Sequence, residues 1–160
     1  ITSPVQYPKS GDWFPKRLAG LAAMLGAGLP MRVVSLSAPG HYDTHSDQAG
    51  ALAQGLQTTS DSLLAFQRDL EARGIADRVL VHVWSEFGRR AQANGHAGTD
   101  HGAAGVGFLV GTPPKRLVTG ELPGPPRAPR QDRTVHPTPS CPSKLAPQTA
   151  SEPSLSIAIL

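Results

Sequence analysis

The sequence predicts an α/β fold, a partial parallel sheet flanked by helices, with a disordered C-terminal tail. Two short Val-rich runs, 31–38 and 78–84, are apolar in the manner of buried strands. A long helical pattern lies between them, and the order strand, helix, strand is typical of the βαβ unit of a parallel sheet. The prolines that follow residue 112 predict the tail.

The first elements follow from spacing along the N-terminal part of the chain. Residues 14–28 are expected to form a helix, because Leu18, Leu21 and Leu25 recur at helical spacing and two glycines end the pattern. The run 31–38 is then expected to be a strand. A polar loop over 39–50 follows it.

The second half of the domain repeats this alternation. A long helix is expected at about 49–73, with an apolar face that ends at Gly74 and contains Leu52, Leu56, Leu63, Phe66 and Leu70. The run 78–84 predicts a second buried strand, and 106–111 predicts a short third strand. The polar segment between them, 85–105, is rich in glycine and in side chains that can bind ligands.

Composition divides the chain into a domain at 1–111 and a Pro-rich tail at 112–160, because eleven of the 16 prolines lie in the tail. The domain carries nine basic and nine acidic residues and the tail six and three, so the whole excess of +3 lies in the tail. Scattered tail charge does not predict nucleic-acid binding. No apolar run approaches the length of a membrane span. The single Cys141 is expected to be an incidental exposed thiol.

Five side chains in the two polar loops are candidate metal ligands. Parallel sheets bind ligands beyond the carboxyl ends of their strands, so both loops are expected to open on one edge of the sheet. Carboxylates and imidazoles without a thiolate suit a divalent metal such as Zn, Mn, Fe, Mg or Ca. The candidates are Asp43, His45, Glu86, Asp100 and His101.

Each candidate ligand also has a structural interpretation. Asp43 could stabilise an Asx-turn while His45 lies exposed, and Asp100 could cap the turn that contains His101. Glu86 could be solvated or paired with a neighbouring arginine. For the other histidines the structural interpretation is favoured: His41 and His96 are expected to be solvated, and His82 is expected to be a hydrogen-bonded core residue.

Arg89 and Arg90 also have two interpretations. Near a metal, their guanidinium groups could bind a phosphate or sulfate ester, with Arg89 as the oxyanion contact. Alternatively, they form an exposed pair at the start of a helix.

The segments GHYDTHSDQ at 40–48 and SEFGRR with GTDHG at 85–90 and 98–102 resemble the bacterial domain-of-unknown-function family 1501. Members of this family show the segments G-F-D-T-H-x-N-Q, S-E-F-G-R and G-T-D-H-G. The resemblance covers roughly residues 7–111. By these motifs, the D-T-H segment contributes Asp43 and His45, S-E-F-G contributes Glu86, and T-D-H-G contributes Asp100 and His101.

This resemblance implies a relationship to the alkaline phosphatase and sulfatase superfamily, with metal ligands at the strand ends of a parallel-sheet core. It also implies a longer protein, exported through a twin-arginine signal to the periplasm or cell surface. The superfamily's usual Asp-His pair is Glu86-Phe87 here. The nucleophile is expected in an earlier half of the domain. A shifted reading frame or a truncated gene is a hypothesis for the tail.

Two function classes follow. The first is a metal-dependent hydrolase of small anionic phosphate or sulfate esters, active as the full-length protein while this chain alone is inactive. The second is a non-catalytic domain that binds a cation or a protein partner for structural reasons. The sequence does not fix the metal, the substrate or the oligomeric state.

Overall fold

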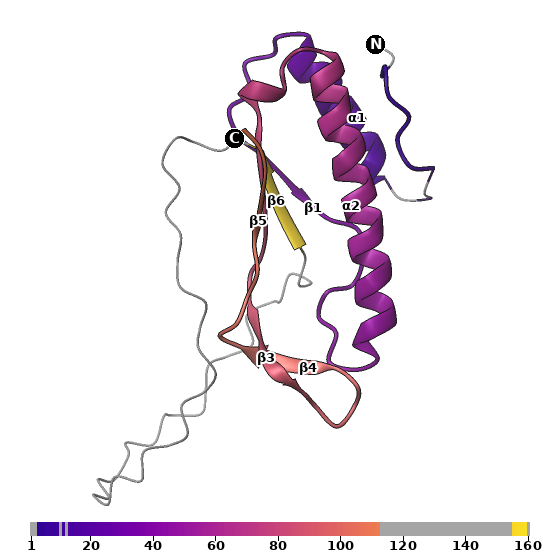
Figure 1. The fold of residues 1–160 in the computed structure, drawn as a ribbon, viewed down its shortest axis with the longest axis vertical. Coiled ribbons are helices and arrows are strands. Elements are labelled where there is room, and N and C mark those ends of the chain that lie inside the picture. The colour runs from indigo at the N-terminus through magenta and orange to yellow at the C-terminus, as the bar shows by residue number, and fades with distance from the viewer. Residues whose placement is uncertain (1–2, 10, 12, 113–154, 160) are drawn as a thin grey trace, which may run out of the picture. The chain divides into compact units, whose positions relative to one another are not determined.

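The computed structural model describes residues 3–9, 11, 13–112 and 155–159, the last of these by their backbone alone. In these residues the two helices lie on one side of a four-stranded sheet, and a two-stranded sheet lies at one end (Figure 1). The elements in chain order are α1 (Phe14–Gly26), β1 (Val34–Ser37), α2 (Gln48–Ala72), the 3-10 turn η1 (Ala76–Arg78), β2 (Leu80–Ser85), β3 (Gly88–Ala93), β4 (Thr99–Gly102), β5 (Phe108–Gly111) and β6 (Leu155–Ile159).

The two predicted helices are confirmed. Helix α1 has Pro15 in its first turn, where the missing N–H is not needed, and it buries Phe14, Leu18 and Leu21. Helix α2 ends just before Gly74, whose φ of 68° is the left-handed conformation that glycine adopts most readily. Among the helices of the described residues, none combines the length and apolar character that crossing a bilayer requires.

The core lies between the helices and the sheet. Phe66 and Leu70 of α2 are 1% and 0% exposed, and they pack in one cluster with Val81 and Val83 of β2. The predicted apolar face of α2 is therefore correct at its C-terminal end. It is wrong at Leu56, which is 42% exposed because the polar residues Thr59 and Ser62 lie on the buried side of this part of the helix.

The prediction of a parallel sheet is wrong, because every strand pairing in the described residues is antiparallel. The strand order of the larger sheet is β1-β6-β2-β5, and β6 runs antiparallel to both of its neighbours. Strands β1 and β2 must therefore run in the same direction, as the βαβ pattern requires, but they are not paired with each other. The loops that follow them consequently still open on one edge of the sheet.

Strand β6 lies in the region where the sequence predicts only a disordered tail, and the structure differs there. Its register joins Val34 with Ile159 on one side and Val81 with the same residue on the other. Residues 113–154, which include Cys141 and most of the predicted tail, lie outside the described residues.

Strand β5 is antiparallel to β2 because of the chain between them. A parallel return to the same sheet needs a crossover, usually a helix. Here residues 86–107 contain the hairpin of β3 and β4 instead, so the chain re-enters the sheet in the opposite direction, with Val83 opposite Phe108. The third predicted strand is confirmed in position, and its direction follows from this hairpin.

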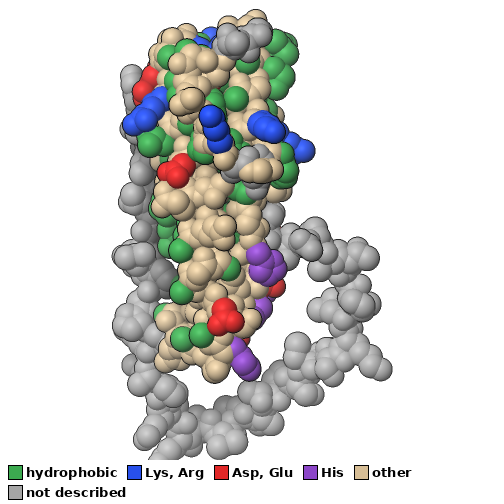
Figure 2. Space-filling view, turned by 90° about the vertical axis from the view of Figure 1, so that its right-hand side faces the viewer, with side chains coloured by type: hydrophobic (Ala, Val, Ile, Leu, Met, Phe, Trp, Pro, Cys, Tyr) green, Lys and Arg blue, Asp and Glu red, His purple; other side chains and the backbone are tan. Residues whose placement is uncertain are grey.

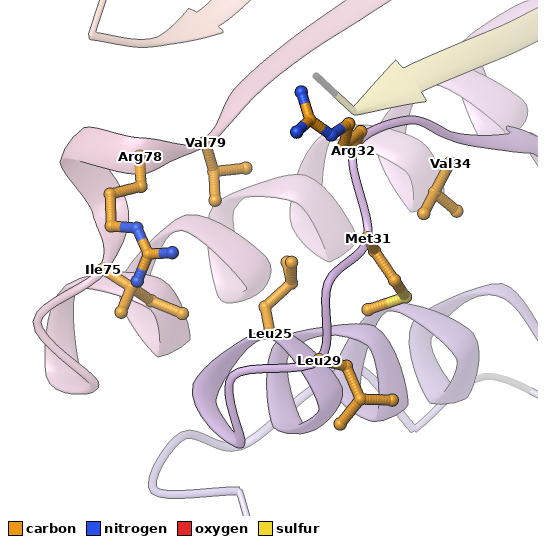
Figure 3. Close-up of a pocket in the computed structure, with 8 residues that line it drawn as sticks. All are labelled: Leu25, Leu29, Met31, Arg32, Val34, Ile75, Arg78 and Val79. Atoms are coloured by element: carbon orange, nitrogen blue, oxygen red, sulfur yellow. The ribbon is translucent and has the colours of Figure 1, made fainter.

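A small pocket lies at the other end of the domain from β3 and β4, where α1 ends near η1 (Figure 3). Its volume of about 80 Å³ is well below the several hundred Å³ typical of sites for small molecules. Leu25, Ile75 and Val79 supply much of its apolar wall, and Arg78 lies beside them. This pocket is therefore too small for a typical small-molecule ligand.

Candidate metal centre

The first part of the site is the loop between β1 and α2. The hydroxyl of Tyr42 anchors it, donating to a backbone carbonyl of the same loop at 3.0 Å and lying 3.1 Å from Thr59 Oγ1 on α2. Tyr42 and Thr44 are buried, whereas the side chains of Asp43 and His45 are 26% and 46% exposed. The alternation of an extended segment therefore turns Asp43 and His45 to the same side.

The second part is the hairpin of β3 and β4, where the sequence predicts a loop. Arg89 pairs with His101, and Gly88 pairs with Gly102. A Cβ at Gly88 would lie 2.6 Å from backbone oxygens, and one at Gly102 would lie 2.7 Å from a backbone nitrogen, so this close pairing requires glycine. The alternative of a helix start at Arg89 is wrong, since this residue lies on a strand.

Backbone hydrogen bonds join the loop to the turn of the hairpin. Asp47 N donates to His96 O at 3.1 Å, and Gln48 N donates to Ala97 O at 3.0 Å. Asp47 and Ala97 adopt φ values of 45° and 56°, which are costly for residues other than glycine and are common at functional sites. The contact between the two segments is therefore maintained at the expense of local backbone strain.

Gly98 permits this contact, and we predict that Gly98→Ala disrupts it. The new Cβ would lie 2.2 Å from the backbone carbonyl of His45, so one segment must move away from the other. We expect the free energy of unfolding to fall by about 1–3 kcal/mol, as overpacking typically costs. Urea denaturation of Gly95→Ala is the matched control, because a Cβ there meets nothing within 4 Å. Equal stabilities of the two variants would contradict the prediction.

Three of the five predicted ligands come together in the structure. Asp43 Oδ1 lies 2.8 Å from His101 Nε2 and 3.0 Å from His45 Nε2. One ligand atom from each residue lies within 4.8 Å of the other two, so a single ion could contact all three. We call Asp43, His45 and His101 the metal triad.

The chemistry of the metal triad fits zinc or a similar transition metal. Two imidazoles and one carboxylate are a ligand set used by catalytic zinc sites, which keep a fourth position open. Zinc bonds of about 2.0–2.1 Å hold tetrahedral donors about 3.3 Å apart. The nitrogen–oxygen separations of 2.8 and 3.0 Å would widen slightly to reach that value, and the largest separation in the triad, 4.8 Å, would have to shorten. Calcium and magnesium prefer more oxygen ligands than the metal triad offers.

Arg89 contacts both the loop and the carboxylate of the triad. Its Nη2 donates to Tyr42 O at 2.8 Å and to Asp43 Oδ1 at 3.2 Å, and its Nη1 donates to the backbone oxygen of Thr99. This arginine therefore ties the loop to β4 and neutralises the triad's carboxylate. Both outer nitrogens of Arg89 already have protein acceptors. The oxyanion contact predicted for Arg89 stays a prediction.

These neighbours stabilise the ionised form of Asp43. The hydrogen bond from His101 is the main cause that lowers the pKa of this carboxyl below its ordinary value of 3.8, and the charges of His45 and Arg89 add to it. Burial opposes the shift. The carboxylate is thus already in the form that a metal ion requires.

The lowered pKa predicts an acid-dependent loss of stability in the metal-free protein. A carboxyl whose pKa is lower in the folded state stabilises that state above its unfolded pKa, and this contribution is lost as the pH falls through the folded value. Urea denaturation should therefore show a steeper fall in stability below pH 3.8 for the wild type than for Asp43→Asn. Parallel pH profiles of the two proteins would refute this assignment.

Asp100 lies behind His45 and does not belong to the triad. Its Oδ1 is 3.5 Å from His45 Nδ1, the nitrogen that faces away from Asp43. A carboxylate in this place orients a metal-binding imidazole and fixes its tautomer. Hydrogen bonding from Asn94, aided by that from His45, lowers the pKa of Asp100. The sequence predicts Asp100 as a ligand, and the geometry favours this supporting position.

Asn94 is a residue that the sequence does not reveal as part of the site. Its side-chain nitrogen donates to His45 O at 2.8 Å and to Asp100 Oδ1 at 3.2 Å. Its side-chain oxygen accepts from the backbone of His96 and Gly98 at 3.0 and 3.1 Å. Asn94 therefore holds the hairpin turn and the loop in register. The only signal in the sequence is an Asn-Gly pair, which is common to many turns.

Glu86 lies on the turn between β2 and β3, and the group of possible metal ligands in the described residues does not include it. The next residue, Phe87, contacts the triad instead. Its ring stacks on His101 with centroids 4.0 Å apart, and Arg89 lies 5.2 Å above it. An aromatic ring thus occupies the place where the resemblance implies a histidine, and it packs against the candidate ligand His101.

Charge is distributed unevenly over the face drawn in Figure 2. Lys and Arg side chains lie over its upper half, and His side chains lie over the lower half, toward the end that carries β3 and β4. The histidines visible on this face therefore lie toward the end of the domain that carries the metal triad.

The comparisons with known proteins agree with the motifs. The sequence model of the family described as "Protein of unknown function (DUF1501)" matches residues 14–123, more than half of the chain. The chain belongs to this family. Neither a curated protein nor a solved structure matches it.

Proposed function

We propose that this member of the DUF1501 family binds a divalent metal ion at Asp43, His45 and His101 and uses it to hydrolyse phosphate or sulfate esters. One observation carries the proposal: the loop after β1 and the hairpin after β2 converge, and three ligand atoms gather within 4.8 Å. We also propose the relationship to the alkaline phosphatase and sulfatase superfamily, which rests on the motifs DTH, SEFG and TDHG.

The residues around the triad would each have a defined task. A bound divalent metal supplies Lewis-acid polarisation of an ester oxygen and a more acidic bound water. Asp43 and the two imidazoles would hold the ion, while Asp100 orients His45 from behind at 3.5 Å. Arg89 fixes the loop to β4, and Phe87 covers one face of His101 and limits its movement.

A second function is favoured by the same contacts. The triad joins a loop to a hairpin, so an ion there would strengthen this junction even without catalysis. On this alternative the chain is a domain in which the cation is structural. Export to the periplasm or cell surface is proposed for either function from the family resemblance alone, and localisation of the protein made from its complete gene tests it.

Metal binding and ester hydrolysis together separate these functions. The metal-depleted chain is titrated with ZnCl₂ and MnCl₂, and hydrolysis of nitrophenyl phosphate and nitrophenyl sulfate is followed with each metal. We expect this chain to bind metal, and we expect metal-dependent turnover in the longer protein that the resemblance implies. Asp43→Ala should lose both. The matched control is His41→Ala, because His41 lies in the same loop and outside the triad.

Binding without turnover, both by this chain and by the protein from the complete gene, would support the structural function and reject the hydrolase. Absence of binding in the correctly folded chain would reject both.

A further inference from the structure

A second pocket adjoins the metal triad on the side of β2. Its volume is about 360 Å³, within the range of pockets that hold small molecules. It lies between the end of β2 and the glycine-rich segment 103–107. Side chains of β2 and of the following turn form the wall that can recognise a ligand, namely His82, Trp84, Ser85, Glu86 and Phe87.

The side chains of this pocket suit a positive charge. Trp84 contributes an aromatic ring, and Glu86 contributes a carboxylate that is exposed to solvent. The ring of Phe87 already packs against His101 and Arg89. Among the described residues that line the pocket, none is Lys or Arg. A cation is attracted to the face of an aromatic ring, most strongly to that of Trp, and a nearby carboxylate adds a direct charge interaction.

The ring of Trp84 is held in place by its neighbour on the strand. His82 stacks on it with centroids 5.1 Å apart and an angle of 22° between the planes. This stack covers one face of the indole and fixes the plane of the ring that lines the pocket. Glu86 has further acceptor positions for a ligand beside its protein partner, because a carboxylate has about four lone-pair sites.

We propose that this pocket binds an organic ammonium group, and that the ester taken by the metal triad carries such a group. The substrate class is thus a phosphate ester of an amino alcohol. Phe87 connects the two subsites, because its ring lines the pocket and stacks on His101 at 4.0 Å. The statement about the ester rests on the proposed function, whereas ammonium binding can be measured without metal.

Choline chloride is a suitable probe, used with the metal-depleted full chain. The sequence contains two tryptophans, so the Trp13→Phe variant reports on Trp84 alone by its fluorescence. We expect saturable quenching by choline. The neutral isostere, with carbon in place of the nitrogen, should bind at least about tenfold more weakly.

Two variants in this background test the residues. Glu86→Gln should weaken choline binding about tenfold, because it removes the charge while keeping the shape. Asp61→Asn is the matched control, since it removes an exposed carboxylate of α2 and should leave binding unchanged. Circular dichroism checks that each variant is folded.

The outcomes separate this proposal from the proposed function. Equal binding of choline and its neutral isostere, or no effect of Glu86→Gln, would overturn the ammonium site even if zinc binds to the triad. Choline binding without any zinc binding would uphold the ammonium site and reject the metal centre.

Discussion

Asp69→Ala is expected to lower the free energy of unfolding by about 3–5 kcal/mol, the cost of breaking a buried ion pair on one side. Asp69 is 0% exposed. Its Oδ1 accepts from Arg73 Nε at 2.7 Å, and its Oδ2 accepts from Ser3 Oγ at 2.7 Å and from the Tyr7 hydroxyl at 3.1 Å. The carboxylate therefore joins the N-terminal segment to α2, and its loss leaves a partly buried guanidinium without its counter-charge.

The groups that bind Asp69 have few ways to compensate for the loss of its carboxylate. Arg73 is 14% exposed, and its Nη2 is buried without a hydrogen-bond partner in the described part of the chain. Burial, together with the charge of Asp69, raises the pKa of Tyr7, so the phenol stays protonated and keeps donating. Within the described residues, Asp69 is the acidic side chain that pairs with Arg73.

Urea denaturation followed by circular dichroism measures the effect. The matched control is Asp61→Ala on the exposed side of the same helix, where Gln57 is the hydrogen-bond partner, and a change within about 0.5 kcal/mol is expected. The double variant Asp69→Leu with Arg73→Met should recover most of the stability, because an apolar pair can replace a buried ion pair. A loss below about 1 kcal/mol for Asp69→Ala would show that the pair contributes little.

The sequence predicts the elements of the fold better than their pairing. The spacing of apolar residues predicts α1 and α2 correctly, because helix formation depends mainly on contacts between residues that are close in the chain. Direction and order of strands depend on partners distant in the chain. The local pattern of residues 155–159 does not predict that they lie between β1 and β2. The sequence also does not predict that the hairpin of β3 and β4 reverses the direction of β5.

The site shows the same division. Asp43 and His45 could be predicted as a pair, since a spacing of two puts both on one side of an extended segment. Their meeting with His101 follows from the common edge of two strands that run in the same direction. The sequence could not separate Glu86 and Asp100 from the residues of the triad. A shift of one residue along a strand decides whether a carboxylate faces the ion or only contacts one of its ligands. Asn94 acts through a turn whose geometry depends on the opposite loop.

The largest effect on binding is expected from the triad itself. His101→Ala should weaken zinc affinity by more than about 100-fold, because a direct ligand is lost, and losses of supporting residues alone reach 10–100-fold. Asp100→Asn should cost about tenfold, since it only changes the partner of His45 Nδ1. Competition with a chromogenic zinc chelator at constant pH measures both affinities.

The difference in zinc affinity between these variants tests the assigned roles more sharply than the loss of binding in one variant does. His96→Ala is the control for His101→Ala, because His96 lies in the same hairpin and contributes only backbone hydrogen bonds to the described contacts. His45→Ala should match His101→Ala if both imidazoles bind the ion. Glu86→Gln should retain the wild-type zinc affinity, since the group of possible ligands does not include it. If Glu86→Gln instead lost zinc as completely as His101→Ala, the ion would have to lie on the β2 side of Phe87, and the triad would be an ion-pair cluster only.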